Sequence, residues 1–201
     1  MGMKQILGAT MKKNLLISIW FTLATTLLLG IVYPLTVTAL AQVLFPRQAN
    51  GELIKSHGKI VGSQLIGQPF TAPGYFYSRP SVAGPAGYDP TASGGSNLGP
   101  TSKALSDRVA ASVKALQPTN PGTPIPADLV TTSGSGLDPD ISPAAAAFQI
   151  PRIAQERRMS EQQVRSLVAK HTKGRQWGFL GEPRVNVLEL NLDLDALHPM
   201  P

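Results

Sequence analysis

The stretch LLISIWFTLATTLLLGIVYPLTVTALAQVLF, residues 15–45, decides the fold of this 201-residue chain. It contains no charged side chain, and it lies between Lys13 and Arg47. A bilayer core about 30 Å thick requires about 20 apolar residues in a helix that rises about 1.5 Å per residue. We therefore predict a single transmembrane helix over residues 14–46, and we expect Pro34, which cannot donate a backbone hydrogen bond, to kink it.

A cleavable signal peptide is the alternative interpretation of this stretch. Two lysines precede it, and Ala39-Leu40-Ala41 resembles a small-residue cleavage site. The apolar part of a signal peptide is about 7–15 residues long, shorter than the uncharged run here, so we expect a retained anchor. Because the residues before the span include no acid and a long following domain translocates largely regardless of its charge, we expect residues 1–13 in the cytoplasm and residues 47–201 outside.

One ridge of the predicted span carries small side chains at four-residue spacing. They are Ser18, Thr22, Thr26 and Gly30. Helices in lipid associate by close packing over small residues, so the ridge could receive a partner helix. Alternatively, the hydroxyl groups bond to carbonyls of their own helix. The pattern does not choose between these two roles.

Composition excludes several classes of function. The net charge is +6, but half of it comes from lysines before the span, and the remaining basic residues are scattered without interleaved aromatics. We therefore expect no nucleic-acid binding. The chain has no cysteine, which rules out thiol nucleophiles, disulfides, iron–sulfur clusters and cysteine zinc sites. Its three histidines have no metal-site spacing, so we expect no catalytic or metal residues.

The periodicity of residues 47–201 predicts one α+β domain. Short strands are expected at residues 60–61 and 65–66, helices at 101–116, 143–158 and 160–174, and a strand at 185–195. The last strand is predicted because leucines alternate strictly with polar residues. Ser142 is expected to cap the helix of residues 143–158, and Ser160 with Gln163 to form a capping box for the next helix. Pro151 is expected to break or kink the first of these helices near Ile150.

Two loops rich in glycine and serine, residues 93–97 and 131–136, are expected to be exposed binding loops. Phosphate cradling is not indicated, because Lys103 lacks the preceding glycine of a phosphate-binding loop. Arg79 follows shortly after three aromatic residues. This pattern predicts either that Arg79 contacts a partner at an interface or that its aliphatic stem covers the aromatic edge of the core. Asp138 and Asp140 precede a helix and could cap it, act as acid and base, or bind a cation.

Several segments together resemble one family, the C subunit of the Kdp-type potassium-transporting ATPase. They are FPRQANG (45–51), GSQLIGQ (62–68), YFYSRPS (75–81), YDPTASGGSNLGP (88–100), PADLVTTSGSGLDPDISPAAAAFQIPR (126–152) and GEPRVNVLELNLDLD (181–195). A tyrosine–proline pair in the span, Tyr33-Pro34, is also part of the likeness. The resemblance covers nearly the whole chain.

This resemblance implies a non-catalytic accessory subunit in a bacterial inner membrane, with a cytoplasmic N-terminus and a periplasmic domain. The implied partners are a channel-like potassium-translocating subunit, a P-type ATPase subunit and a small hydrophobic subunit, together with membrane lipid. The family is held to support assembly and stability and to act as a catalytic chaperone that raises the ATP affinity of the ATPase subunit. It is therefore often called ATP-binding, but we expect no firmly bound cofactor, because an outer domain meets no cytosolic ATP.

Combining this topology with loop exposure, we expect the subunit contacts in the two loops and at three polar residues nearby. These candidates are Ser93, Gly94, Gly95, Ser96, Asn97, Ser133, Gly134, Ser135 and Gly136, with Arg79, Gln149 and Arg152. Two alternatives from other classes stay open. One is a membrane-anchored hydrolase with a loop serine and His57 or His171 as base, and the other is an outer ligand-binding sensor module.

Overall fold

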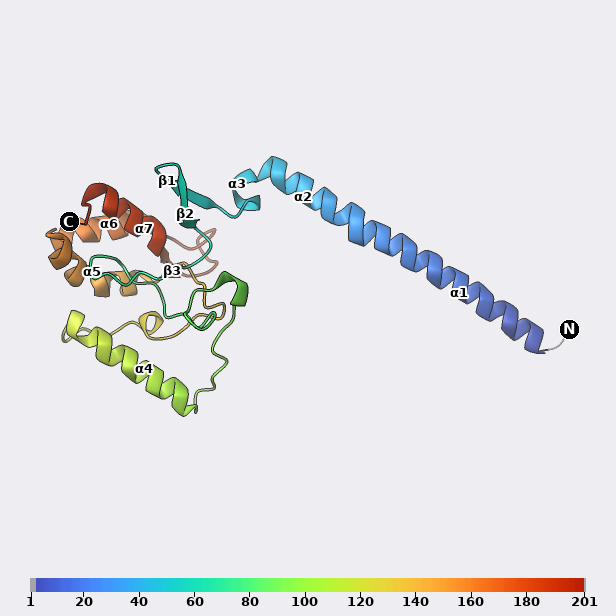
Figure 1. Ribbon diagram of the computed structural model, residues 1–201, viewed down its shortest axis with the longest axis horizontal. Helices are drawn as coiled ribbons and strands as arrows, with labels where there is room; N and C mark the ends of the chain where they lie inside the picture. The colour runs from blue at the N-terminus through green and yellow to red at the C-terminus, as the bar shows by residue number, and fades with distance from the viewer. Residues whose placement is uncertain (1–2, 201) are drawn as a thin grey trace. The chain divides into compact units, whose positions relative to one another are not determined.

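The computed structural model describes residues 3–200, which form two compact units (Figure 1). The first unit ends at Glu52 and the second begins at Leu53. The first is almost entirely helical, whereas the second mixes helices with short strands. The predicted division into one long apolar helix and one α+β domain is confirmed at this level.

The N-terminal unit is a long helix in three parts, followed by a short turn of helix. These are α1 (Met3–Leu27), a π-helical turn (Leu28–Val32), α2 (Tyr33–Leu44) and α3 (Pro46–Ala49). Residues 10–44 are apolar enough to cross a membrane, and none of that stretch's most apolar window is buried. The amide of Tyr33 donates to the carbonyl of Leu28, five residues earlier.

The kink predicted at Pro34 is replaced by this π-helical turn. Figure 1 shows α2 continuing α1 without a sharp bend. Proline lacks an amide hydrogen and its ring crowds the carbonyl four residues before it. A wider turn directly before the proline accommodates that crowding, so the helix continues.

A β-hairpin opens the second unit. Its strands are β1 (Leu53–Ser56) and β2 (Lys59–Ser63), which pair antiparallel with a register shift between Ile54 and Lys55. The predicted strand at residues 60–61 is confirmed within β2. The predicted strand at 65–66 is wrong, because the amides of Leu65 and Ile66 turn back to Ser63.

A small sheet and three helices enclose the core. The strands β3 (Asp140–Ile141), β5 (Arg184–Asn186) and β4 (Thr172–Lys173) are antiparallel in that order, and the helices are α5 (Pro143–Arg157), α6 (Glu161–His171) and α7 (Val187–Leu197). The fully buried apolar side chains include Phe76, Ile150, Ile153, Val164, Val185, Leu190 and Leu194. Three 3-10 turns (Pro90–Ala92, Gln117–Thr119 and Ala127–Leu129) lie in the long connections.

The prediction of a strand over residues 185–195 is wrong beyond Asn186. The chain turns into α7, and the side chain of Asn186 caps it by accepting from the amide of Glu189 at 3.1 Å. Val187, Leu190, Asn191 and Leu194 are buried, a spacing of three and four residues that belongs to a helix. Leucine favours helices and is not β-branched, so its alternation here did not specify a strand.

The helices α5 and α6 begin as predicted. Ser142 caps α5 by accepting from the amide of Ala145 at 3.0 Å, and Ser160 and Gln163 form the predicted capping box of α6. Of the break or kink predicted near Ile150, the break is wrong, because α5 runs unbroken through Pro151 to Arg157. Residues on both sides of the proline are fully buried, so packing holds the helix together where proline removes one backbone hydrogen bond.

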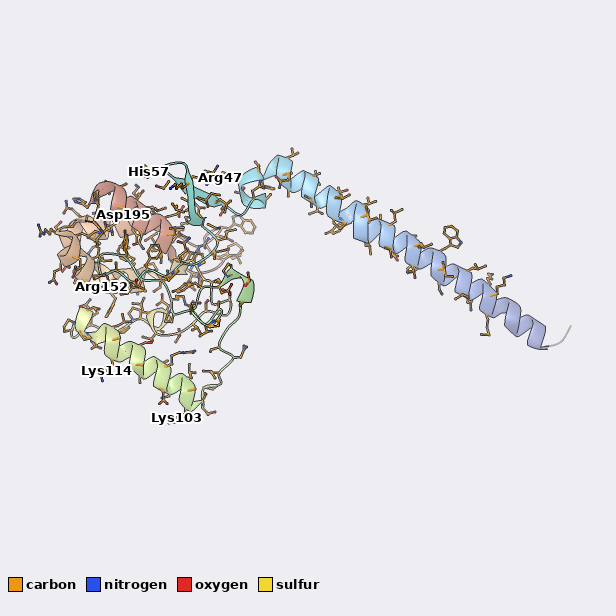
Figure 2. All side chains as sticks on the ribbon, viewed as in Figure 1. Arg47, His57, Lys103, Lys114, Arg152 and Asp195 are labelled. Carbon is orange, nitrogen blue, oxygen red and sulfur yellow. The ribbon has the colours of Figure 1, made fainter. Side chains whose placement is uncertain are left out.

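The remaining helix, α4 (Lys103–Leu116), matches the predicted helix of residues 101–116. None of its residues is fully buried, although the apolar stripe is partly covered. Figure 2 shows Lys103 and Lys114 along this helix, away from the hairpin that carries His57.

Two buried side-chain amides hold an irregular segment against the core. Asn191 of α7 accepts from the amide of Phe76 at 2.9 Å and donates to its carbonyl at 3.0 Å. Gln149 of α5 does the same for Tyr77, accepting at 2.7 Å and donating at 3.2 Å. The segment thus obtains from two helices the backbone pairing that a neighbouring strand would give.

Truncating Leu194 should cost far more stability than truncating Leu192. As a fully buried residue of α7, Leu194→Ala should lower the free energy of unfolding by about 2–5 kcal/mol. Leu192 is partly exposed, so Leu192→Ala should cost about 1 kcal/mol. Urea unfolding of the chain in mild detergent, followed by circular dichroism, measures both. Equal losses would instead indicate the alternating strand.

Candidate interaction site

The two loops predicted to be binding loops lie against each other. The amide of Gly94 donates to the carbonyl of Ser135 at 2.8 Å, and the hydroxyl of Ser93 donates to the same carbonyl at 3.1 Å. Ser93, Asn97, Gly134 and Ser135 are exposed. We call residues 93–97 and 131–136 together the loop pair. Sequence identified both loops but could not show that they contact each other.

Close backbone approach explains the glycines of the loop pair. A Cβ atom on Gly136 would lie 2.8 Å from the carbonyl oxygen of Gly94, and Gly136 also has a φ of 67°. A Cβ on Gly95 would lie 3.1 Å from the carbonyl oxygen of Gly134. Gly94 and Gly134 themselves face open space. The pair therefore has a tightly packed seam and an open outer surface.

Hydroxyl groups inside the second loop fix its shape. Ser133 accepts from the amide of Gly136 at 2.9 Å, and Ser135 accepts from the amide of Leu137 at 3.1 Å. Together with the bond from Gly94, these contacts occupy amides that a bound phosphate would need. The loop pair is thus a folded surface rather than an open anion cradle.

Arg79 anchors the second loop through two contacts of its guanidinium. Its guanidinium pairs with Asp138 at 3.1 Å and donates to the carbonyl of Thr132 at 3.3 Å. The hydroxyl of Tyr88 donates to the carbonyl of Arg79 at 2.5 Å, and burial raises the pKa of this phenol. This ion pair inside the domain is neither of the two roles predicted for Arg79, and the interface contact stays a prediction.

A polar cleft of about 530 Å³ adjoins Arg79. Its charged lining residues are Arg79, Asp128, Asp138, Asp140, Glu182 and Arg184. Both arginines of the lining are paired, Arg79 with Asp138 at 3.1 Å and Arg184 with Asp140 at 2.9 Å. Burial raises the pKa of Asp140, while the contacts with Asn186 and Arg184 oppose that shift.

The described residues contain no cluster of three or more metal-ligand side chains in this cleft or elsewhere. Neither predicted carboxylate caps α5. Asp138 binds Arg79 and the amide of Asp140, whereas Asp128 accepts from the amide and hydroxyl of Ser142. The contact of Asp128 was not predicted, because fourteen residues separate it from the capping serine and no local pattern links them.

Gln149 and Arg152 do not share the surface of the loop pair, contrary to their place among the predicted contact loops. Both lie on α5, with 1% and 9% of their surface exposed. Arg152 donates to Gln149 at 2.8 Å and to the carbonyl of Tyr75 at 3.0 Å, and it stacks on the ring of Tyr77 at 3.9 Å. Figure 2 labels Arg152 within the domain. These side chains hold the Tyr75–Tyr77 segment in place.

The small-residue ridge keeps its continuity through the π-helical turn. A Cβ on Gly30 would still lie 3.9 Å from the methyl group of Thr26. Ser18 bonds back to the carbonyl of Asn14 at 2.9 Å, which is the local role that the sequence left open. The ridge from Thr22 to Gly30 stays a candidate for helix packing.

In the described part of the chain, the structure does not bring a histidine together with a loop serine as a serine hydrolase requires. His171 contacts Asp193 at 2.8 Å, and His57 contacts the neighbouring Ser56 at 3.0 Å in the exposed hairpin turn. Neither imidazole contacts a serine of the loop pair within residues 3–200. The loop serines instead bind backbone groups.

Comparison with known proteins assigns relatives over most of the chain. Residues 15–196 match the family model described as "KdpC: K+-transporting ATPase, c chain". A potassium-transporting ATPase KdpC subunit from Koribacter versatilis is 63% identical over 191 residues, covering 95% of this chain and 98% of the relative. Proteins of the same name from Methylococcus capsulatus and Methylobacterium nodulans are 59% and 57% identical, each covering 76% of this chain and 82% of the relative.

A methyl group at the seam of the loop pair should separate the two loops. We expect Gly136→Ala to destabilise the domain by about 1–3 kcal/mol, because alanine resists a positive φ and meets Gly94. Gly134→Ala is the matched control and should be nearly neutral, since it faces open space. Urea unfolding measures the loss, and faster hydrogen exchange of the Gly94 amide reports the opening. Unchanged exchange in Gly136→Ala would contradict the packing.

Proposed function

This chain belongs to the KdpC family, the c chains of K+-transporting ATPases, and from that premise we propose that it is a non-catalytic accessory subunit needed for assembly and stability of the potassium-uptake complex. The observation that carries the proposal is the loop pair, which is held by internal hydrogen bonds, polar and partly exposed, without any catalytic arrangement in the described residues. Such a surface suits recognition of another protein. It does not suit turnover of a substrate.

The proposed topology has one membrane span, a cytoplasmic N-terminus and a periplasmic domain in the bacterial inner membrane. The long apolar helix of residues 10–44 supports the span. Lysines at positions 4, 12 and 13, with no acid in the N-terminal flank, support the orientation. The ridge of Thr22, Thr26 and Gly30 would receive a helix of a partner subunit by close packing.

The proposed partners are a channel-like potassium-translocating subunit, a P-type ATPase subunit and a small hydrophobic subunit. In this arrangement the loop pair contacts the translocating subunit near the outer potassium entrance. Exposed Ser93, Asn97 and Ser135 would supply hydrogen bonds to that partner. Because the loop backbone is already fixed by internal hydrogen bonds, little conformational entropy is lost on docking.

We place ATP hydrolysis on the ATPase subunit and assign this chain an indirect influence on it. As a catalytic chaperone, the chain would raise the ATP affinity of the complex by stabilising the partner state that binds nucleotide. The engaged amides of Gly94, Gly136 and Leu137 support an indirect route over direct phosphate binding by the loop pair.

A bulky side chain on the open surface of the loop pair should disrupt assembly without unfolding the domain. Gly94 faces open space, so Gly94→Trp should fold normally but should abolish co-purification of the partner subunits and growth at low potassium. Gly99→Trp is the control, because Gly99 also faces open space but lies outside the pair. Circular dichroism verifies folding of both variants. Normal assembly and transport in Gly94→Trp would overturn the proposed contact.

A further inference from the structure

An exposed apolar and basic surface lies on two neighbouring segments of the second unit. One segment is the β1–β2 hairpin, and the other is the loop of residues 174–183 that connects β4 to β5. Glu189 joins them, because its carboxylate contacts Gln64 after the hairpin and Lys173 before the loop. Figure 1 shows this loop, drawn faintly, beside the lower end of the hairpin. We call these two segments the hairpin–loop surface.

The loop presents aromatic side chains to solvent in a fixed conformation. Trp177 is 85% exposed and Phe179 is 68% exposed. Hydrogen bonds between Gln176 and Leu180, each 2.9 Å, close the turn, and Arg175 pairs with Glu182 at its base. Trp177 has a φ of 52°, a backbone conformation that residues other than glycine rarely adopt. An ordered, strained turn that exposes tryptophan indicates a binding role rather than a packing role.

The hairpin adds apolar side chains together with unpaired positive charge. Leu53 and Ile60 are 52% and 59% exposed. Lys55 pairs across the hairpin with Ile60, and Lys59 precedes it; both lysines are exposed. Within residues 3–200 neither lysine forms an ion pair, whereas Lys173, Arg175 and Arg184 each do. The free positive charge of this surface is therefore concentrated on the hairpin.

We propose that the hairpin–loop surface docks on the headgroup region of the membrane, with Trp177 and Phe179 inserted at the interface and Lys55 and Lys59 on anionic lipid. Tryptophan is enriched where lipid headgroups meet the acyl chains, and each lysine near an anionic surface adds attraction. Lysine is depleted from protein–protein interfaces, so the hairpin fits a lipid surface better than a protein pocket. The inference rests on the proposed membrane anchoring, not on the proposed subunit contact.

Tethering makes weak docking sufficient. Only residues 45–52 separate the apolar helix from the first strand of the domain. A short tether converts docking into an intramolecular event with a high effective concentration. A few apolar side chains and two lysines can then hold the surface at the bilayer, although they would bind a membrane poorly by themselves.

Tryptophan fluorescence of the full chain in nanodiscs tests this proposal. The chain has two tryptophans, Trp20 in α1 and Trp177 in the loop, so Trp20→Phe leaves Trp177 as the only reporter. In nanodiscs of phosphatidylcholine with phosphatidylglycerol, we expect the fluorescence emission of Trp177 to lie at shorter wavelength than in detergent. Lipids brominated on the acyl chains should quench it, and acrylamide should quench it less than in detergent.

Two further variants give controls for position and anchoring. With both tryptophans replaced by phenylalanine, Lys114→Trp on the exposed helix α4 should stay accessible to acrylamide. Trp177→Phe retains Trp20, which brominated lipid should quench if the helix is in the bilayer. An unquenched Trp20 would overturn both the anchoring and the docking, whereas a quenched Trp20 with a water-exposed Trp177 would overturn the docking alone.

Charge reversal tests the lysines. We expect Lys55→Glu with Lys59→Glu to weaken the docking equilibrium at least about tenfold in phosphatidylglycerol nanodiscs, and to change little in pure phosphatidylcholine. Both lysines are exposed, so folding should be unaffected. An equal effect in both lipids would overturn the electrostatic part of the proposal. Protection of Trp177 that requires added partner subunits would assign the surface to a protein and overturn the lipid proposal.

Discussion

The domain depends on two buried amide side chains that replace a missing strand. Gln149 and Asn191 each bind both backbone groups of one residue, Tyr77 and Phe76 respectively. A buried backbone group left without a partner costs about 1–3 kcal/mol, so this irregular segment could not be buried without the two amides. Because the amides come from α5 and α7, the same contacts fix the segment and join two helices of the core.

The geometry of the loop pair follows from this arrangement. Phe76 is fully buried, which fixes the direction of the chain as it leaves the core. The hydroxyl of Ser78 then donates to the carbonyl of Gln68, and Arg79 reaches Asp138 at the base of the second loop. The first loop is in turn held by its bonds to Ser135. The loop pair, a surface made of glycine and serine, is thereby positioned by a hydrophobic core that lies several residues away.

Local chemistry explains which elements the sequence could predict. The long apolar helix, the helix of residues 103–116 and the caps at Ser142 and Ser160 depend on signals within a few residues of each other. The same local view placed the glycine and serine loops at the surface. It also left two roles open for Arg79, an interface contact and a cover over the aromatic core edge, and the ion pair with Asp138 inside the domain is neither of them.

The failures have a common cause in contacts between distant parts of the chain. The alternating pattern placed Asn191 on the solvent face of a strand. Asn191 instead lies on the buried face of α7, where it binds the backbone of Phe76, 115 residues away. Gln149 looked like a residue beside a helix break, but it binds Tyr77, 72 residues away. No periodicity within one segment encodes such a partner, because a buried amide and an exposed amide have the same local pattern. The burial of a polar residue that interrupts an apolar helix face is therefore set by distant contacts and cannot be predicted from the local sequence.

The domain separates its rigid and adaptable chemistry between two surfaces. In the loop pair, glycines without room for a side chain hold backbone against backbone, so its shape is set by the fold. On the hairpin–loop surface, lysine and aromatic side chains extend from short strands and a tight turn, so contact there depends on long side chains rather than on a matched shape. The first arrangement suits a partner with one defined structure. The second suits a fluid surface whose lipids rearrange around the protein, and a short connection to an apolar helix keeps such a surface within reach.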